Sequence, residues 1–252
     1  MQIIPGLYRL GDSSGGEVRS YLIDDGGELI LIDTLLDNNG TLVLQELQQM
    51  GRQPGDIKKI ILTHAHQSHF GGLAALKKAT GAPVYSHDYE APILAGQKQA
   101  PVPSTTTLLP QRPLALYKYQ AAFVLHLKIP PPCPVDQTLK DGDRVGPLTV
   151  LHTPGHTAGS LSFYWPEKRA LIAGDIVTTW PEMALGWPMI TMDNAQNRDS
   201  VGKLCDMVQA DVLCVGHGEP VVQGAVDFMR DLVAGKQTQP VLLQAKARAA
   251  GA

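Results

Sequence analysis

Three histidines stand within six residues in the segment T-H-A-H-Q-S-H, which spans residues 63–69. In extended backbone, residues two apart point to the same side, so His64 and His66 can converge on one ion. His69 lies three residues further, where a helix is expected to begin, and can reach a second position nearby. Neutral imidazole nitrogens are ligands for zinc, iron and manganese. Core packing rarely explains three imidazoles in so short a run, and the spacing therefore predicts a metal site.

Two further histidines and one carboxylate stand at turns that follow expected strands. His156 lies between two glycines in T-P-G-H-T-A-G-S at residues 153–160, and His217 lies in G-H-G at residues 216–218. Asp175 ends the apolar run L-I-A-G-D at residues 171–175. A carboxylate at the end of such a strand is either a helix cap or a metal ligand. Beside five histidines of this kind, we interpret Asp175 as a ligand.

The order and spacing of these motifs resemble the metallo-β-lactamase superfamily. H-x-H-x-x-H is followed by T-P-G-H-T-x-G-S, then G-D, then G-H-G, and the likeness runs from about Leu7 to Leu232. The resemblance implies an α/β fold of the αββα type, a sandwich of two mixed β-sheets flanked by helices. The metals would be held in loops along one edge of the sheets.

The resemblance also implies how the candidate ligands are shared between two metals. The first metal would be bound by His64, His66 and His156, the second by His69 and His217, and Asp175 would bridge the two. The implied cofactor is one or two zinc ions, with iron or manganese as alternatives. A bridging aspartate is typical of the glyoxalase II and lactonase-like hydrolases of the superfamily.

One position departs from the family pattern. The family motif is H-x-H-x-D-H, whose aspartate binds the second metal and orients the attacking hydroxide, whereas this chain has Ser68 there. A serine hydroxyl is neutral and is a poor ligand compared with a carboxylate. We therefore expect weak or partial occupancy of the second site, with a one-metal enzyme or a loss of hydrolysis as alternatives. Asp175 and Ser68 are the two candidate catalytic positions.

Two residues are candidates for supporting the ligands without touching an ion. Asp33, in L-I-D-T at residues 31–34, matches the family's early aspartate and would hold the metal loops in place. Its ordinary alternative is a turn residue at the end of a strand. His152 is either a similar supporting residue or a packed strand histidine.

The stretch 178–192, just after the candidate bridging carboxylate, is rich in tryptophan, proline and methionine. Trp180 and Trp187, with Thr178, are candidates for the wall of a pocket for an apolar substrate, or they are ordinary loop packing. Lactonases of the superfamily have a tyrosine three residues after the bridging aspartate. Thr178 stands there instead, which argues against the hydrolysis of acyl-homoserine lactones.

The leading functional hypothesis is a metal-dependent hydrolase that uses a metal-activated water on an ester, thioester or lactone carbonyl. A mononuclear iron persulfide dioxygenase is one alternative, with His64, His156 and Asp175 as its facial triad. A β-lactam hydrolase is another, although genuine β-lactamases are normally exported and do not usually have the bridging aspartate. A binding or regulatory protein that has lost catalysis is the last.

The elements that must position these residues repeat a strand and helix pattern in both halves of the chain. Hydrophobic periodicity and turn residues predict helices at 40–50, 70–79, 200–209 and 225–234. They predict strands at 6–10, 18–23, 29–33, 59–63, 84–86, 148–152, 160–165, 170–173 and 212–215. Residues 1–235 are expected to form one metallo-β-lactamase-like domain, and residues 236–252 a loosely held C-terminal tail.

The segment 88–140 differs in composition from the rest of that domain, because it is rich in proline. Its apolar stretch 114–129 lies between prolines and is too short to span a bilayer. It is either a helix buried against its own domain or a lid or homodimer contact. In both cases it is expected to be an insertion rather than a separate domain, because it is too small to build its own core.

Composition bounds the class of protein. The 252 residues hold 21 Lys and Arg against 24 Asp and Glu, a net charge of −3 that argues against a nucleic-acid partner. No apolar run reaches membrane-spanning length, and the N-terminus does not read as a signal peptide. Three cysteines without a C-x-x-C motif suit a reducing compartment. We therefore expect a cytoplasmic protein that acts on a small molecule.

Overall fold

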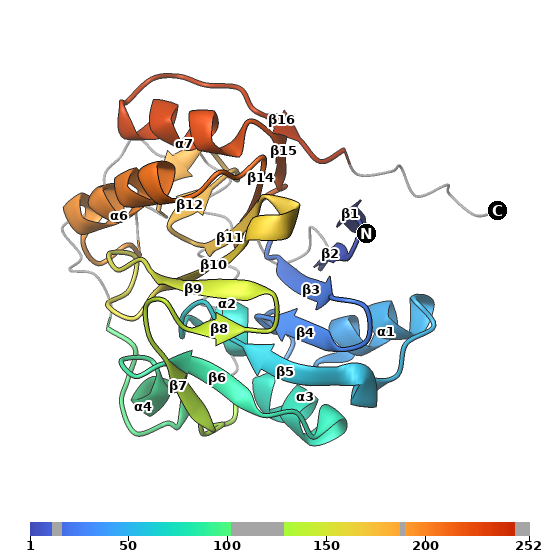
Figure 1. Ribbon diagram of the computed structural model, residues 1–252. Coiled ribbons are helices and arrows are strands. Elements are labelled where there is room, and N and C mark those ends of the chain that lie inside the picture. The colour runs from blue at the N-terminus through green and yellow to red at the C-terminus, as the bar shows by residue number, and fades with distance from the viewer. Residues whose placement is uncertain (12–16, 102–128, 187–189, 245–252) are drawn as a thin grey trace.

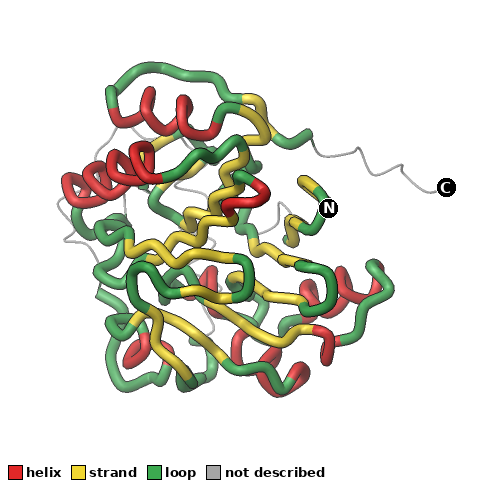
Figure 2. The backbone as a smooth tube through the Cα atoms, viewed as in Figure 1, coloured by secondary structure: helices red, strands yellow, loops and turns green. Residues whose placement is uncertain are grey.

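Two seven-stranded mixed β-sheets lie face to face between two layers of helices. This computed structural model describes residues 1–11, 17–101, 129–186 and 190–244. The strands fill the middle of the molecule and the helices lie on its two outer sides (Figure 1 and Figure 2). The predicted αββα sandwich is confirmed.

The first sheet has its strands in chain order. It contains β1 (Gln2–Ile4), β2 (Leu7–Leu10), β3 (Ser20–Asp24), β4 (Leu29–Ile32), β5 (Ile57–Ile61), β6 (Val84–His87) and β7 (Gln137–Leu139). Strands β1 to β4 pair antiparallel, and β4 to β7 pair parallel. Its outer face is covered by α1 (Thr41–Gln49) and α3 (Leu73–Thr80), whose apolar side chains pack against it.

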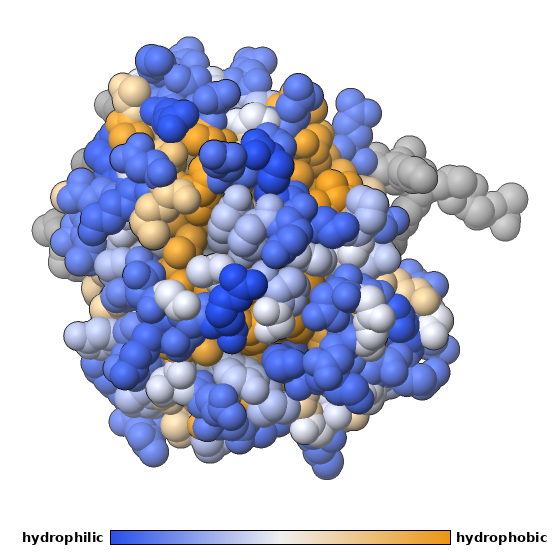
Figure 3. Space-filling model, in the orientation of Figure 1, coloured by the Kyte–Doolittle hydropathy of each residue, from blue (hydrophilic) through white to orange (hydrophobic). Residues whose placement is uncertain are grey.

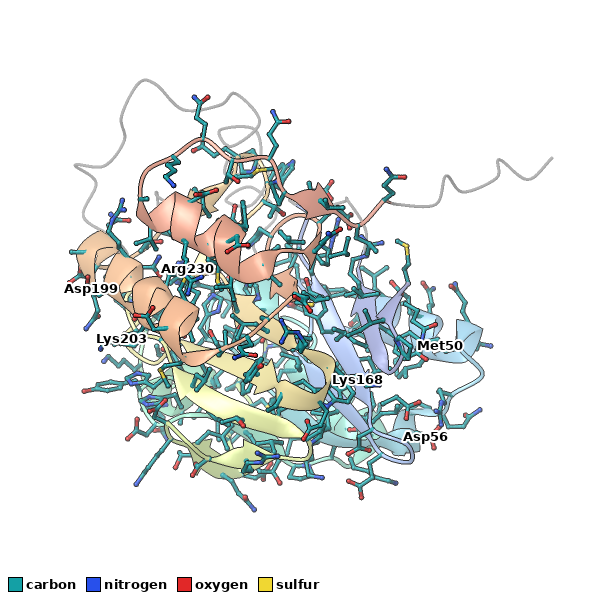
Figure 4. The ribbon with its side chains drawn as sticks, turned by 45° about the horizontal axis from the view of Figure 1, so that its top comes forward. Met50, Asp56, Lys168, Asp199, Lys203 and Arg230 are labelled. Atoms are coloured by element: carbon teal, nitrogen blue, oxygen red, sulfur yellow. The ribbon has the colours of Figure 1, made fainter. Side chains whose placement is uncertain are left out.

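The second sheet runs in the order β16, β15, β14, β11, β10, β9, β8. These strands are β8 (Arg144–Val145), β9 (Leu148–His152), β10 (Leu161–Trp165), β11 (Ala170–Gly174), β14 (Val212–Val215), β15 (Val221–Gln223) and β16 (Val241–Leu242). Helices α6 (Asn194–Met207) and α7 (Ala225–Val233) cover its outer face. Arg230 of α7 lies toward α6 in Figure 4, where its guanidinium donates to the carbonyl of Cys205 at 3.0 Å.

The sequence of β4 explains how one strand serves two core layers. Leu29 and Leu31 pack toward the helices, whereas Ile30 and Ile32 pack toward the opposing sheet, and all four are buried. Alternate residues of a strand point to opposite faces, so a strand covered on both sides needs an uninterrupted apolar run.

The surface in Figure 3 is mostly hydrophilic, with apolar side chains showing in patches between polar ones.

Two parallel strand pairs bring the candidate ligands to one place. Strands β4 and β5 are parallel neighbours in the first sheet, and β11 and β14 are parallel neighbours in the second. Asp33 follows β4, and the T-H-A-H segment follows β5, while Asp175 follows β11 and His217 follows shortly after β14. Parallel strands end at the same edge of a sheet, which is where open α/β sheets hold their ligands.

The remaining described elements are short. They are α2 (Gln67–Phe70), α4 (Ala91–Leu94), the 3-10 turns η1 (Pro54–Asp56) and η3 (Pro166–Lys168), and a small hairpin of β12 (Val177–Thr178) and β13 (Ala184–Leu185). In the described part of the chain, no helix is long and apolar enough to cross a membrane.

Two of the four predicted helices have different bounds in the structure, and the short helices α2 and α4 were not predicted. The helix predicted at 70–79 corresponds to α3 and begins at Leu73, after the short helix α2; between them Gly71 and Gly72 pack against the backbone of residues 34–37, where a Cβ would overlap carbonyl oxygens. The helix predicted at 200–209 begins earlier, at Asn194, because the carboxylate of Asp193 accepts a hydrogen bond from the Gln196 amide at 2.9 Å and caps it.

The apolar stretch 114–129 lies outside the described residues except for its last residue, so the lid and dimer interpretations stay predictions. The described ends of the 88–140 segment form α4 and β7, and β7 pairs parallel with β6 in the first sheet. Within the predicted tail, Val241 and Leu242 form β16, which pairs with β15 at the edge of the second sheet.

Candidate metal centre

Four predicted ligands come together in what we call the first ligand group: His64, His66, His156 and Asp175. The Nε2 of His64 and the Nε2 of His156 lie 3.1 Å and 3.0 Å from the Nδ1 of His66. Oδ2 of Asp175 lies 3.7 Å from the first of these Nε2 atoms and 3.5 Å from the second. Two nitrogens bound to one tetrahedral zinc ion would be about 3.3 Å apart, so the group fits a single ion.

The remaining two predicted histidine ligands form a second ligand group around the same carboxylate. Oδ2 of Asp175 lies 3.3 Å from the Nε2 of His69 and 3.3 Å from the Nε2 of His217. The candidate donor atoms of this group all lie within 4.8 Å of one another, and so do those of the first group. One carboxylate oxygen is therefore positioned between two sets of imidazole nitrogens.

Hydrogen bonds on the far sides of the rings aim these nitrogens inward. The Nδ1 of His69 donates to Oδ2 of Asp33 at 2.9 Å, which leaves its Nε2 without a proton in the neutral ring. Thr63 donates its hydroxyl to the same Asp33 oxygen at 2.8 Å and accepts from the Nδ1 of His64 at 3.0 Å. The Nδ1 of His156 pairs with the Thr191 hydroxyl at 3.1 Å. Asp33 thus contacts the His69 ring directly and the His64 ring through Thr63.

Burial and charge shift the pKa of His69 in the opposite direction to the pKa values of the three histidines in the first ligand group. Burial lowers the pKa of His156 to about 4 and lowers the pKa of His64 and His66 well below 6.5, so these rings are neutral at pH 7. Burial would also lower the pKa of His69, but the carboxylates of Asp175 and Asp33 outweigh it and raise that pKa to about 10. Burial opposes ionisation of Asp175, yet the neighbouring histidines hold its pKa well below 3.8.

Several buried polar atoms at the centre have no hydrogen-bond partner among the described residues. Within the described residues, both carboxylate oxygens of Asp175 and the Nε2 of His69 are buried without a hydrogen bond of normal geometry. Leaving such groups unsatisfied costs free energy, and a cation placed among them would satisfy them. Gly216 packs directly against these groups: a Cβ there would overlap Oδ1 of Asp175 and lie 2.7 Å from Cε1 of His69. The residues therefore fit a metal ion.

Ser68 is buried in α2, between His66 and His69. Position 66 is the N-cap of α2 and Gly72 is the N-cap of α3, and neither helix has a side-chain cap hydrogen bond. Ser68 therefore does not serve as a helix cap, although serine is among the residues favoured at such positions. Its place in the second ligand group stays a prediction.

The other predicted site residues that the structure describes contact the loops beside the ligand groups. The Nε2 of His152 lies 2.9 Å from the carbonyl oxygen of Ala158, so this ring contacts the loop that carries His156. Thr178 is buried and directs its hydroxyl to the carbonyls of Trp180 and Glu182, at 2.8 Å and 3.1 Å. The amide nitrogen of Trp180 lies beside Gly218, next to His217. Trp187 lies outside the described residues.

Sequence reasoning missed two charged residues that hold the ligand loops. Glu90 is 2% exposed and bonds to both the 63–66 loop and the 156–159 loop. Arg19 is 1% exposed; its amide donates to the carbonyl of Gly216 at 2.8 Å and its guanidinium to Glu219 at 2.8 Å. Both stand in unremarkable sequence, and their partners are too distant in the chain for a local pattern to reveal them.

Comparison with known proteins agrees with this geometry. A family model described as the metallo-beta-lactamase superfamily matches residues 14–217. The probable metallo-hydrolase YflN of Bacillus subtilis (strain 168) is 27% identical over 225 residues, which cover 81% of this chain and 79% of that protein.

A more partial likeness involves an enzyme with a named activity. A hydroxyacylglutathione hydrolase of Bdellovibrio bacteriovorus is 31% identical over 126 residues, which are 48% of this chain and 35% of that enzyme. Among solved structures, TTHA1623 in a di-iron-bound form matches with a TM-score of 0.64 and 25% identity, over 89% of this chain and 98% of that one.

Proposed function

We propose that this chain, which belongs to the metallo-β-lactamase superfamily, uses a metal-activated water to hydrolyse an ester, thioester or lactone. The observation that carries the proposal is the position of Asp175, whose single oxygen Oδ2 lies 3.3–3.7 Å from four imidazole nitrogens. The first ligand group would hold the tighter ion and the second ligand group a weaker one. We propose zinc, which suits histidine and carboxylate ligands.

A zinc ion at this site would lower the pKa of a bound water from about 16 to about 7 and polarise a carbonyl oxygen. The chain itself supplies the geometry and the charge. Asp33, Thr63 and Thr191 fix the ring orientations, so the donor atoms are organised before any ion arrives. Asp175 supplies one buried negative charge, and Ser68 adds none where the family usually has a second.

We propose that substrate reaches the centre from the side of His66. This residue is partly buried, whereas the other five candidate ligands are buried. A pocket opens there between the two ligand loops and α4. Its lining is mainly apolar and includes Ala65, Ile93 and Ala158, with Lys98 also on the wall. This recess is small, about 40 Å³, and we propose only that it marks the side from which a substrate approaches His66.

The choice of substrate class draws on the relatives. Probable metallo-hydrolases and a hydroxyacylglutathione hydrolase support hydrolysis as the reaction type. Thr178 uses its hydroxyl within its own loop, so it does not replace the tyrosine expected of an acyl-homoserine lactonase. Thioesters and simple esters are therefore the first substrates to test.

The test is a panel of esters, thioesters, lactones and β-lactams, with metal content measured on the same preparation. We expect zinc and turnover of one of the first three classes, abolished by chelation and restored by zinc. One iron per chain with oxygen consumption on a persulfide would replace this proposal by a dioxygenase. Turnover of β-lactams alone would make it a β-lactamase, and firm metal binding without turnover of any class would favour a binding protein.

A further inference from the structure

We infer that Glu90 is a positioning residue that fixes the two ligand loops of the first ligand group against each other. Glu90 precedes α4 and comes from neither loop. One loop, at residues 63–66, carries His64 and His66, and the other, at 153–160, carries His156. The inference rests on the proposed metal site and assigns a residue that the ligand motifs do not include.

The two oxygens of the Glu90 carboxylate point to different loops. Oε2 accepts a hydrogen bond from the amide of Ala65 at 2.9 Å. Oε1 accepts from the hydroxyl of Thr157 at 2.8 Å and from the amide of Gly159 at 3.0 Å. A carboxylate that accepts three hydrogen bonds from two segments acts as a bridge, and such charged hydrogen bonds are among the stronger ones in proteins.

The bonded atoms lie next to the ligands in the chain. Ala65 stands between His64 and His66, and Thr157 directly follows His156. The bridge therefore spans the pair of rings whose nitrogens lie 3.0 Å apart. Metal ligands have to be held within about 0.5 Å of their productive positions, so a residue that sets the distance between two loops sets the affinity for the ion.

The surroundings of Glu90 are built for a close fit. Glu90 is 2% exposed, so water competes only weakly for the groups that form the three hydrogen bonds. A Cβ on residue 159 would lie 2.6 Å from Oε1, so the glycine there is what allows the loop to approach the carboxylate. This gives Gly159 of the T-P-G-H-T-x-G-S motif a specific partner on another element.

The test compares metal affinity in Glu90→Gln and wild type, with Zn²⁺ and Co²⁺ titrated against a chromophoric chelator. Glutamine keeps the shape, but its amide nitrogen must face one of the N–H donors, so one loop loses its bond. We expect the dissociation constant of the first ion to rise about 10- to 100-fold, the range for residues that orient metal ligands. The visible spectrum of bound Co²⁺ should change as well, because the ligand geometry is altered.

A matched control is Asp141→Asn. Asp141 accepts the amide of His152 at 2.7 Å, close to the same loop, but it does not bridge to residues 63–66. Its variant should bind both ions as wild type does. If Glu90→Gln lowers the melting temperature of the metal-free protein but keeps the wild-type dissociation constant and Co²⁺ spectrum, Glu90 is merely structural and the inference is overturned.

A second variant covers the case in which Glu90→Gln does not fold. Thr157→Val preserves the side-chain shape and removes one of the two bonds to Oε1, and we expect a several-fold weaker first site. An unchanged affinity in that variant also overturns the inference. If the wild type itself binds neither ion, the proposed metal site fails together with this inference, whereas a failure of Glu90 alone leaves the metal site standing.

Discussion

The two ligand groups should respond differently to pH when metal is added to the metal-free protein. A metal ion binds only neutral imidazole, so a protonated ring must lose its proton first. At pH 7 the rings of the first ligand group are neutral, since burial lowers their pKa values, that of His156 to about 4. His69 in the second ligand group is protonated, since Asp175 and Asp33 overcome its burial and raise its pKa to about 10.

The size of the effect follows from the difference between this pKa and the pH. Removing a proton at pH 7 from a group with a pKa of about 10 costs roughly 4 kcal/mol, or about a thousandfold in affinity. Metal affinity at the second ligand group should therefore increase with pH, about tenfold for each pH unit between pH 6 and 9. Affinity at the first ligand group should depend less on pH over the same interval, because its rings are already neutral at pH 7.

The assay is competition against chelators of graded affinity at pH 6, 7, 8 and 9, with one and then two equivalents of Zn²⁺. Proton release is followed in parallel with a pH indicator in weakly buffered solution. At pH 7 we expect wild type loaded with two equivalents of Zn²⁺ to have released about one proton more than His69→Ala, which should keep the first binding step intact. A zinc-bound water with a pKa of about 7 adds to the release in both proteins, so the difference between the two proteins is what reports on His69. Equal pH slopes for both steps, or equal proton release by the two proteins, would refute the reasoning.

Three further outcomes are expected. Ser68→Asp should add a carboxylate to the second ligand group and strengthen the second ion about tenfold or more, measured as zinc per chain under limiting zinc; two firmly bound ions already in wild type, with no gain in the variant, would contradict it. His66→Ala should lose the first metal and the activity together, and full metal retention by elemental analysis would show the ligand assignment to be wrong. Gly216→Ala should lower the free energy of unfolding by about 1–3 kcal/mol, because the added methyl overlaps Oδ1 of Asp175. The measurement is urea denaturation, and an unchanged midpoint would mean that the backbone moves aside.

The sequence was informative where local pattern and chemistry coincide. An apolar run that ends in a carboxylate predicted a strand with Asp175 at its end, and β11 ends at Gly174. The short spacing of His64 and His66 predicted convergence, and their nitrogens lie 3.1 Å apart. The layering of two sheets was implied by family resemblance, because periodicity within one strand does not say which sheet will cover it.

Contacts between distant segments are what the sequence could not supply. Glu90 meets Ala65 and Thr157 across 25 and 67 residues, a separation at which no local pattern connects them. The start of α6 was missed because a single aspartate cap, Asp193, outweighs the weak apolar periodicity of its first two turns. Both errors concern side-chain hydrogen bonds that only the folded chain brings into reach.

The ligand residues divide evenly between the two sheets, and this division bears on how the protein comes apart. His64, His66 and His69 follow β5 of the first sheet, whereas His156, Asp175 and His217 follow strands of the second. A bound ion would then act as a staple across the seam between the two halves, since an ion that binds only the folded state stabilises it by mass action. Two fragments cut between residues 88 and 140 would each carry half of the coordination sphere. Their reassociation should therefore depend on the free metal concentration, which makes the seam a natural place to build a metal-gated split protein.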